Sequence, residues 1–370
     1  MKILLFNKLF LNLPVIVLLF ILLLSPSINA QKDSLNNFEI ELFPILNYDS
    51  DAGFGYGGKG FLYNFLGGEE SFDFTLYNST KGERWYRVVF STPDIQRRQG
   101  TKYPIAFDLT FDYDKWINYK FYSTYYNYQT GEVVDRSENY IREPIELTAM
   151  FSRGFAKDFV AELGARFKNI SCYNFDSTGI LQYRTQTDVK YLSLIFNFRW
   201  DTRTNFINPQ NGFVLEIDNE YSPDLFKQGY PFYKLEILSQ FYLTLLKPNY
   251  VWANRIILQT ITDVTYQLQL PLGGNNTVRG LSQDRYLSTS TTLINSEFRF
   301  PVWKRFGGIA GLDMGSIGSF FCDSNRENDP GWIINPVLGL RFYMDNFVVR
   351  FDVGFGSETT GIYFNFGHVF

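Results

Sequence analysis

The sequence predicts an all-β fold, a 16-stranded antiparallel β-barrel that spans a membrane. Three observations support this prediction. Apolar and polar residues alternate along most of the chain, which is the period of a β-strand whose two faces meet different environments. Aromatic residues make up 19% of the sequence, with 38 Phe, 25 Tyr and 6 Trp, which is high for a soluble globular protein. The chain also begins with a segment typical of secreted proteins.

That first segment has the three parts of a secretory signal peptide. Lys2 and Lys8 supply positive charge, residues 14–24 are apolar, and "SPSINA" ends at Ala30 with Ile28 at the −3 position. The apolar part is short for a retained membrane anchor, and Gln31 stands where a lipoprotein would need Cys. We therefore expect residues 1–30 to be a cleaved signal peptide, residues 31–37 a short periplasmic segment and residues 38–370 the transmembrane barrel.

The segment "FVVRFDVGFG", residues 347–356, shows the alternation most clearly. Its Phe and Val residues share one face, while Arg350, Asp352, Gly354 and Gly356 share the other. The polar face of a secreted β-sandwich, the alternative fold, should be rich in Lys, Thr and Ser. Arg, Asp, Glu, Asn and Gly opposite a Phe-rich face are instead typical of a barrel with a polar lumen and a lipid-facing exterior.

The same alternation, read backward from the C-terminus, predicts sixteen strands. Even strand numbers are typical of closed bacterial barrels. With both termini in the periplasm, the connections near residues 154, 247, 303 and 345 become short periplasmic turns, and those near residues 114–141, 171–187, 263–289 and 320–332 become long extracellular loops. The predicted strands are 38–48, 52–65, 70–79, 83–92, 103–113, 142–153, 156–170, 188–200, 211–222, 231–246, 250–262, 290–302, 308–319, 333–344, 347–356 and 361–370.

Composition excludes several classes of function. The net charge is −4 with no basic tract, so nucleic-acid binding has no support. No CxxC or HExxH spacing occurs. His368, the single histidine, is expected at the periplasmic end of the last strand as an interfacial residue. We therefore predict no catalytic, cofactor or metal site and no enzymatic activity. Cys172 and Cys322 fall near extracellular strand ends, and whether they pair is left open.

Three short motifs resemble those of the bacterial surface antigen superfamily, which includes the BamA/TamA-type outer-membrane assembly factors. They are "LGGNNTVRG" at 272–280, "NSEFRFPV" at 295–302 and "GLDMGSIG" at 311–318. The resemblance implies a long extracellular loop that folds into the lumen, where an arginine docks against acidic residues of the next two strands. By motif, that arginine is Arg279, flanked by Val278 and Gly280, and its candidate partners are Glu297 and Asp313.

Further segments extend the resemblance over nearly all of residues 38–370. "DTRTNFINPQNG" at 201–212 is similar to a periplasmic turn of the family, and "NYDSDAGFGYGGKG" at 47–60 is similar to its first hairpin. The C-terminal "YFNFGHVF" is similar to the family's aromatic β-signal, which assigns that role to Tyr363, Phe364, Phe366 and Phe370.

Two features depart from the family pattern. Members usually carry periplasmic POTRA domains before the barrel, whereas here we expect only residues 31–37. The VRG motif is usually followed by an aromatic residue, but Leu281 stands there, and Tyr286 is the candidate substitute in packing.

The resemblance implies an integral barrel of the bacterial outer membrane that assembles or translocates client proteins, acting with a separate periplasmic or membrane partner. It would work through a weak seam between strands 38–48 and 361–370, with the glycines of 53–60 nearby lowering the cost of opening. Two alternatives stay open: a pore, and a lipid-handling or structural accessory barrel. Whether Arg279 controls conformation or only stabilises the barrel is also open.

Overall fold

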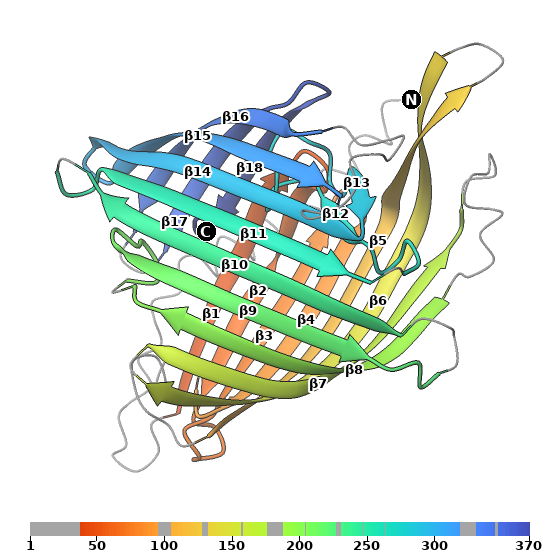
Figure 1. The fold of residues 1–370 in the computed structure, drawn as a ribbon. Helices are drawn as coiled ribbons and strands as arrows, with labels where there is room; N and C mark the ends of the chain where they lie inside the picture. Colours follow the sequence, from red (N-terminus) through yellow and green to blue (C-terminus); the bar gives the residue numbers. More distant parts are fainter. Residues whose placement is uncertain are drawn as a thin grey trace, which may run out of the picture.

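Sixteen antiparallel strands close into one barrel in the computed structural model (Figure 1). This confirms the predicted fold. The structure describes residues 38–94, 105–127, 132–156, 158–175, 188–203, 205–226, 231–245, 247–262, 264–318, 331–344 and 347–370. The predicted signal peptide, the segment 31–37 and Cys322 lie outside these ranges. Within them, no helix is long and apolar enough to cross a membrane.

The barrel strands follow one another around the wall, each beside its neighbour in sequence, and the wall closes where the first meets the last. A separate two-stranded hairpin, β12 (Leu270–Leu272) with β13 (Tyr286–Ser288), lies in the connection between β11 and β14. The barrel strands are β1 (Glu39–Asp49), β2 (Gly53–Tyr63), β3 (Ser71–Ser79), β4 (Glu83–Thr92), β5 (Ala106–Asn127), β6 (Glu132–Ala156), β7 (Phe159–Tyr173), β8 (Asp188–Asp201), β9 (Gly212–Ser222), β10 (Phe232–Thr244), β11 (Val251–Ile261), β14 (Ser290–Trp303), β15 (Phe306–Ile317), β16 (Ile333–Tyr343), β17 (Val348–Phe355) and β18 (Thr360–Phe366).

The two faces of the strands divide as the alternation predicts. On β17, Arg350 and Asp352 are buried on the inner face, whereas Phe351 and Phe355 are exposed on the outer face. The outer face is thus apolar and aromatic, while the inner face carries the charges. This is the arrangement of a transmembrane barrel, because charges that face a lumen can pair with one another and charges that face lipid cannot.

The two ends of the barrel differ in their connections. We call the end where β1 begins and β18 ends the turn end, because it carries tight turns such as residues 304–305. The opposite end, which we call the loop end, carries the long connection 262–289 with its β12–β13 hairpin. The predicted asymmetry between short turns and long loops therefore places the inward-folding loop at the loop end.

Strands β5 and β6 are longer than predicted. Residues 114–127 and 132–141, expected to belong to a loop, continue the two strands through an irregularity between Trp116 and Tyr119. Beyond it, Tyr119 and Phe121 are buried against Tyr266 of the connection between β11 and β14. The alternation is hard to read there, because these aromatic residues are covered by another part of the chain rather than by lipid.

The C-terminal strand is shorter than predicted. It ends at Phe366, and residues 367–370 leave the wall at Gly367, whose φ of +80° lies in the region that favours glycine. Phe370 is consequently buried beside Tyr242 on the inner side of the barrel. The prediction that the last strand extends to residue 370 is wrong over residues 367–370, because a single left-handed residue breaks the period of two.

The seam between β1 and β18 is the weakest join in the wall. The strands pair only at the loop end, where Tyr48 lies opposite Phe364 and Asp49 opposite Tyr363. On its other side, β1 pairs with β2 along its whole length. From Glu39 to Asn47, β1 has no partner toward β18 among the described residues, and the outward side chains of Ile40 and Leu42 are 55% and 70% exposed.

Candidate functional site in the barrel lumen

The loop that carries Arg279 is a compact structure. Gly273, Gly274 and Gly280 all have positive φ values, which lets the chain reverse tightly between β12 and β13. The amide of Gly273 donates to Oγ1 of Thr277, and the amide of Gly274 donates to the carbonyl of Leu281. The loop therefore presents Arg279 to the lumen from a preorganised backbone.

Arg279 is fully buried and is surrounded by carboxylates. Its Nε donates to Oδ2 of Asp313 at 2.7 Å and its Nη2 to Oδ1 of the same residue at 2.9 Å. Its Nη1 lies 2.8 Å from both Glu297 Oε1 and Asp352 Oδ2. A guanidinium removed from water needs this kind of bidentate, charge-assisted bonding to offset its desolvation. The structure thus brings Arg279 together with Glu297 and Asp313, the two predicted partners.

Asp352 of β17 is a third partner that the sequence motifs do not identify. The alternation along residues 347–356 places it on the polar face, but it gives no information on which loop residue comes near. Arg341 of β16 also bonds to Asp352 and lies 3.5 Å from Glu297, and Arg350 lies 3.5 Å from Asp352. The site therefore spans four strands, β14 to β17, rather than two.

The neighbours of Arg279 hold the loop by different means. Val278 is fully buried in an apolar cluster with Leu272, Leu281 and Leu293. Tyr286 packs against this cluster, so it does supply the aromatic contact that Leu281 cannot. The three residues of the motif thus combine apolar burial, charge pairing and close backbone approach.

Gly280 lets the backbone of the loop lie close to strands β17 and β18. Its amide donates to the hydroxyl of Tyr363 at 3.1 Å, and its carbonyl accepts from Oγ1 of Thr359 at 2.8 Å. A Cβ on Gly280 would lie 2.7 Å from the backbone of Gly354, well inside van der Waals contact. Tyr363, predicted to belong to the β-signal, therefore faces the lumen and holds the loop, whereas Phe364 and Phe366 lie on the outer side of β18.

A second set of contacts fastens the loop at the loop end. The amide of Gln283 donates to Asp51 in the β1–β2 turn at 2.9 Å, and Arg285 donates to Glu358, between β17 and β18, at 2.7 Å. Burial, followed by the nearby charge of Asp49, raises the pKa of Asp51 to about 6. The loop therefore bridges the two sides of the seam.

The chain's own C-terminus enters the same lumen. Arg299 lies 3.1 Å from Glu297 through its Nε and donates through Nη2 to the main-chain oxygen of Phe370 at 2.8 Å. His368, expected at the membrane interface, is instead partly buried with its ring 3.3 Å from Oδ1 of Asn208. The reversal at Gly367 accounts for both positions.

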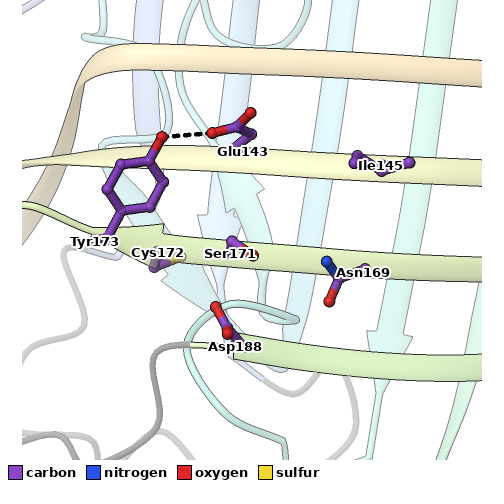
Figure 2. A pocket seen from close by; sticks show the side chains of 7 residues that line it. All are labelled: Glu143, Ile145, Asn169, Ser171, Cys172, Tyr173 and Asp188. Carbon is purple, nitrogen blue, oxygen red and sulfur yellow. Dashed lines mark hydrogen bonds between the residues drawn. The ribbon is translucent and has the colours of Figure 1, made fainter.

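A separate pocket of about 480 Å³ lies at the loop end of β6, β7 and β8, and Figure 2 shows its lining. Tyr173 and Glu143 point toward one another there, and Glu143 also accepts from Tyr113 and from Lys115. Its neighbour Cys172 is buried with Tyr140 and Tyr266. Because the polar groups of Glu143 and Tyr173 satisfy one another, we assign this pocket no functional role.

Comparison with known proteins identifies the family. The Omp85 superfamily domain matches residues 64–370, which is most of the chain and includes the loop, its partner strands and the C-terminus. The chain belongs to the Omp85 superfamily. This confirms the resemblance to the assembly-factor barrels drawn from the motifs. No curated protein shows a significant sequence match to the chain.

Solved structures support the fold independently. BamA from Haemophilus ducreyi, in a structure lacking POTRA domains 1–3, superposes with a TM-score of 0.64 at 10% identity, over 92% of this chain and 74% of that one. CdiB from Escherichia coli gives a TM-score of 0.64 at 15% identity, over 91% and 63%. CdiB from Acinetobacter baumannii gives 0.53 at 13% identity, over 91% and 61%. The chain spans less than two thirds of either CdiB structure, and at these identities the likeness concerns the fold.

Proposed function

We propose that this Omp85-superfamily barrel lies in the bacterial outer membrane and inserts or translocates client proteins through the seam between β1 and β18, without enzymatic activity or a cofactor. The observation that carries the proposal is the seam itself. The two strands pair only through Tyr48 with Phe364 and Asp49 with Tyr363. The loop end would face the exterior and the turn end the periplasm.

The chemistry of an open strand edge supports this function. The backbone N–H and C=O groups of β1 that point toward β18 lack a strand partner from Glu39 to Asn47 among the described residues. In a bilayer, an unpaired backbone group costs several kcal/mol, so such an edge favours pairing with another extended chain. An incoming strand would satisfy these groups and place its apolar side chains beside Ile40 and Leu42.

The lumen network makes strands β14 to β17 more rigid than the first hairpin, β1 with β2, which lies beyond β18 in the wall. Arg279 ties the loop to β14, β15 and β17 through Glu297, Asp313 and Asp352. The first hairpin, by contrast, carries glycines at positions 53, 55, 57, 58 and 60 of β2. Glycine has no side chain to pack against its neighbours and allows more backbone freedom, so this hairpin is more flexible. Opening at the seam would therefore move β1 and β2 while β14 to β17 hold their shape.

We infer that the chain works with a separate periplasmic or membrane partner that delivers clients to the turn end. Lipid of the outer membrane would surround the apolar exterior. The pore alternative is less well supported, because the buried loop and the C-terminal residues 367–370 both occupy the lumen.

Reversible closure of the seam tests the function. In a background with both native cysteines replaced by Ser, Tyr48→Cys with Phe364→Cys places two thiols at opposed outward positions across the seam. The matched control, Leu46→Cys with Tyr56→Cys, bridges β1 and β2, which are paired throughout. Outer-membrane protein levels are then measured by proteomics after the wild-type copy is depleted.

We expect the oxidised seam pair to lower the level of client proteins, with recovery on reduction, and the control pair to behave as wild type. Full client levels with a quantitatively cross-linked seam would contradict the proposal. Unchanged levels of outer-membrane proteins on depletion, together with altered solute permeability, would favour the pore.

A further inference from the structure

The turn between β14 and β15 brings a tryptophan to the outer face through a local irregularity. Arg299 is buried on the inner face of β14, so strict alternation would turn Trp303 inward as well. The register shifts between Pro301 and Trp303, where Val302 is an extra residue. Such a β-bulge re-aims the side chains that follow it. Trp303 is consequently 61% exposed and stacks on the outward ring of Phe306, with the two centroids 6.2 Å apart.

Two cations follow this tryptophan at the tip of the turn. Lys304 is exposed, and its Nζ lies 4.7 Å from the centroid of the Trp303 ring, within cation–π range. The φ of Lys304 is +48°, a left-handed conformation that reverses the chain sharply. Arg305 is also exposed, and its carbonyl accepts from the amide of Tyr343 at 2.8 Å. The turn is therefore held against β16, with both cations beside the outward indole ring.

The neighbouring turn, between β10 and β11, extends the same surface. Lys247 is exposed there, and the ring of Tyr250 lies 6.2 Å from that of Phe298 on β14. The sequence contains no Asp or Glu in residues 237–262 or 298–312, so no carboxylate of these two hairpins offsets the cations. We call the following residues the basic girdle patch: Lys247, Trp303, Lys304, Arg305 and Phe306.

Charge is distributed unevenly around the turn end. Among the described residues 38–42 and 60–72, at the turn end of β1, β2 and β3, the exposed charged side chains are Glu39, Glu41 and Glu69. An anionic surface is attracted to the basic girdle patch and repelled by these carboxylates. Trp beside Lys and Arg is typical of protein surfaces at the level of lipid headgroups, where the indole contacts the upper acyl chains and the cations reach the phosphates.

We propose that the basic girdle patch binds the headgroup of an anionic phospholipid in the periplasmic leaflet. Lys304 and Arg305 contact the phosphate, Lys247 adds attraction from the next turn, and Trp303 and Phe306 contact the glycerol and the upper acyl chains. Anionic lipid then gathers beside β10 to β15 and not beside the first hairpin. The proposal rests on the proposed placement of the barrel in the outer membrane and does not require client insertion through the seam.

Lipid binding to the purified barrel tests the proposal. Native mass spectrometry of the folded chain in detergent micelles measures the affinity for palmitoyl-oleoyl-phosphatidylglycerol, which carries a net negative charge. The matched probe is palmitoyl-oleoyl-phosphatidylcholine, which has the same acyl chains and phosphate but no net charge. The test variant is Lys304→Asn with Arg305→Gln, because Asn tolerates a left-handed backbone. The control variant is Arg84→Gln with Lys120→Gln, which removes two exposed cations at the loop end.

We expect phosphatidylglycerol to bind the wild-type chain about tenfold or more tightly than phosphatidylcholine. The test variant should bind phosphatidylglycerol about thirtyfold more weakly, since it loses two cations near the headgroup, and should bind phosphatidylcholine as the wild type does. The control variant should behave as wild type toward both lipids. Inorganic phosphate should not displace phosphatidylglycerol, because it lacks the acyl chains that Trp303 contacts.

Equal affinity of the wild-type chain for the two lipids would overturn the proposal. An unchanged affinity in the test variant, an equal loss in the control variant, or displacement by inorganic phosphate would overturn it as well. If the test variant does not fold, judged by loss of heat-modifiable mobility, Arg305→Gln alone decides, with an expected loss of about fivefold. A barrel that binds phosphatidylglycerol as expected but fails the seam test contradicts the proposed function and leaves this site in place.

Discussion

Arg279→Ala should release the loop from the lumen while the barrel still assembles. In the native structure the guanidinium makes two bonds to Asp313 and one each to Glu297 and Asp352. Removing one partner of a buried ion pair costs about 3–5 kcal/mol, because the remaining charge is left without compensation.

Most of the free-energy cost of Arg279→Ala should arise at Asp313, because its charge is left with the fewest partners. Glu297 keeps Arg299 at 3.1 Å and Asp352 keeps Arg350 at 3.5 Å, whereas the described bonds that Asp313 retains come from Asn295 and from the backbone of residue 279. A loss of about 3 kcal/mol lowers the ratio of docked to undocked loop more than 100-fold. Adding Asp313→Asn should recover part of that loss, since it removes the uncompensated charge.

Limited proteolysis within residues 273–285 and single-channel conductance in planar bilayers measure the effect. We expect faster cleavage and higher conductance for Arg279→Ala, with heat-modifiable mobility retained. Asn276→Ala serves as the control in the same loop, because Asn276 is exposed and substitutions at such positions usually change stability by no more than about 0.5 kcal/mol. Cleavage and conductance equal to those of wild type would refute the reasoning that the charge network holds the loop.

Three further changes test other parts of the same site. Gly280→Ala places a Cβ 2.7 Å from the backbone of Gly354 at a φ of +88°, so loop cleavage should accelerate. Gly58→Ala, whose Cβ would find its nearest atom 3.8 Å away, should not change it, and equal effects of the two changes would contradict the packing argument. Tyr363→Phe removes the acceptor for the Gly280 amide and should cost about 1 kcal/mol of docking, measured by the same cleavage rate; an unchanged rate would show that this bond is dispensable. Burial, followed by the charge of Asp49, raises the pKa of Asp51 to about 6. Its contribution to the stability of the folded barrel is therefore complete below pH 3.8, the ordinary value, and is lost as the pH rises through about 6. The urea concentration at the midpoint of unfolding should accordingly fall between about pH 5 and pH 7.5 in the wild type and fall less in Asp51→Asn, and parallel pH profiles would exclude Asp51 as the cause.

The class of fold and the faces of the strands follow from the alternation along the sequence. Alternation is a local property of the chain, so Arg350 and Asp352 could be assigned to the polar face of their strand, and Glu297 to the polar face of its own, without any knowledge of neighbours. The motif around Arg279 predicted the pairing with Glu297 and Asp313, because members of a family share contacts that the alternation in one sequence does not reveal.

Which distant groups meet depends on the closed barrel as a whole. Asp352 reaches Arg279 across 73 residues of sequence, and no local pattern reports such a distance. The register of β1 against β18, and thus the weakness of the seam, depends on how sixteen twisted strands close on one another. The path of Phe370 depends on one backbone angle at Gly367. The pairing of buried charges belongs to the assembled barrel, because the charged side chains come from the loop and from β14, β15, β16 and β17.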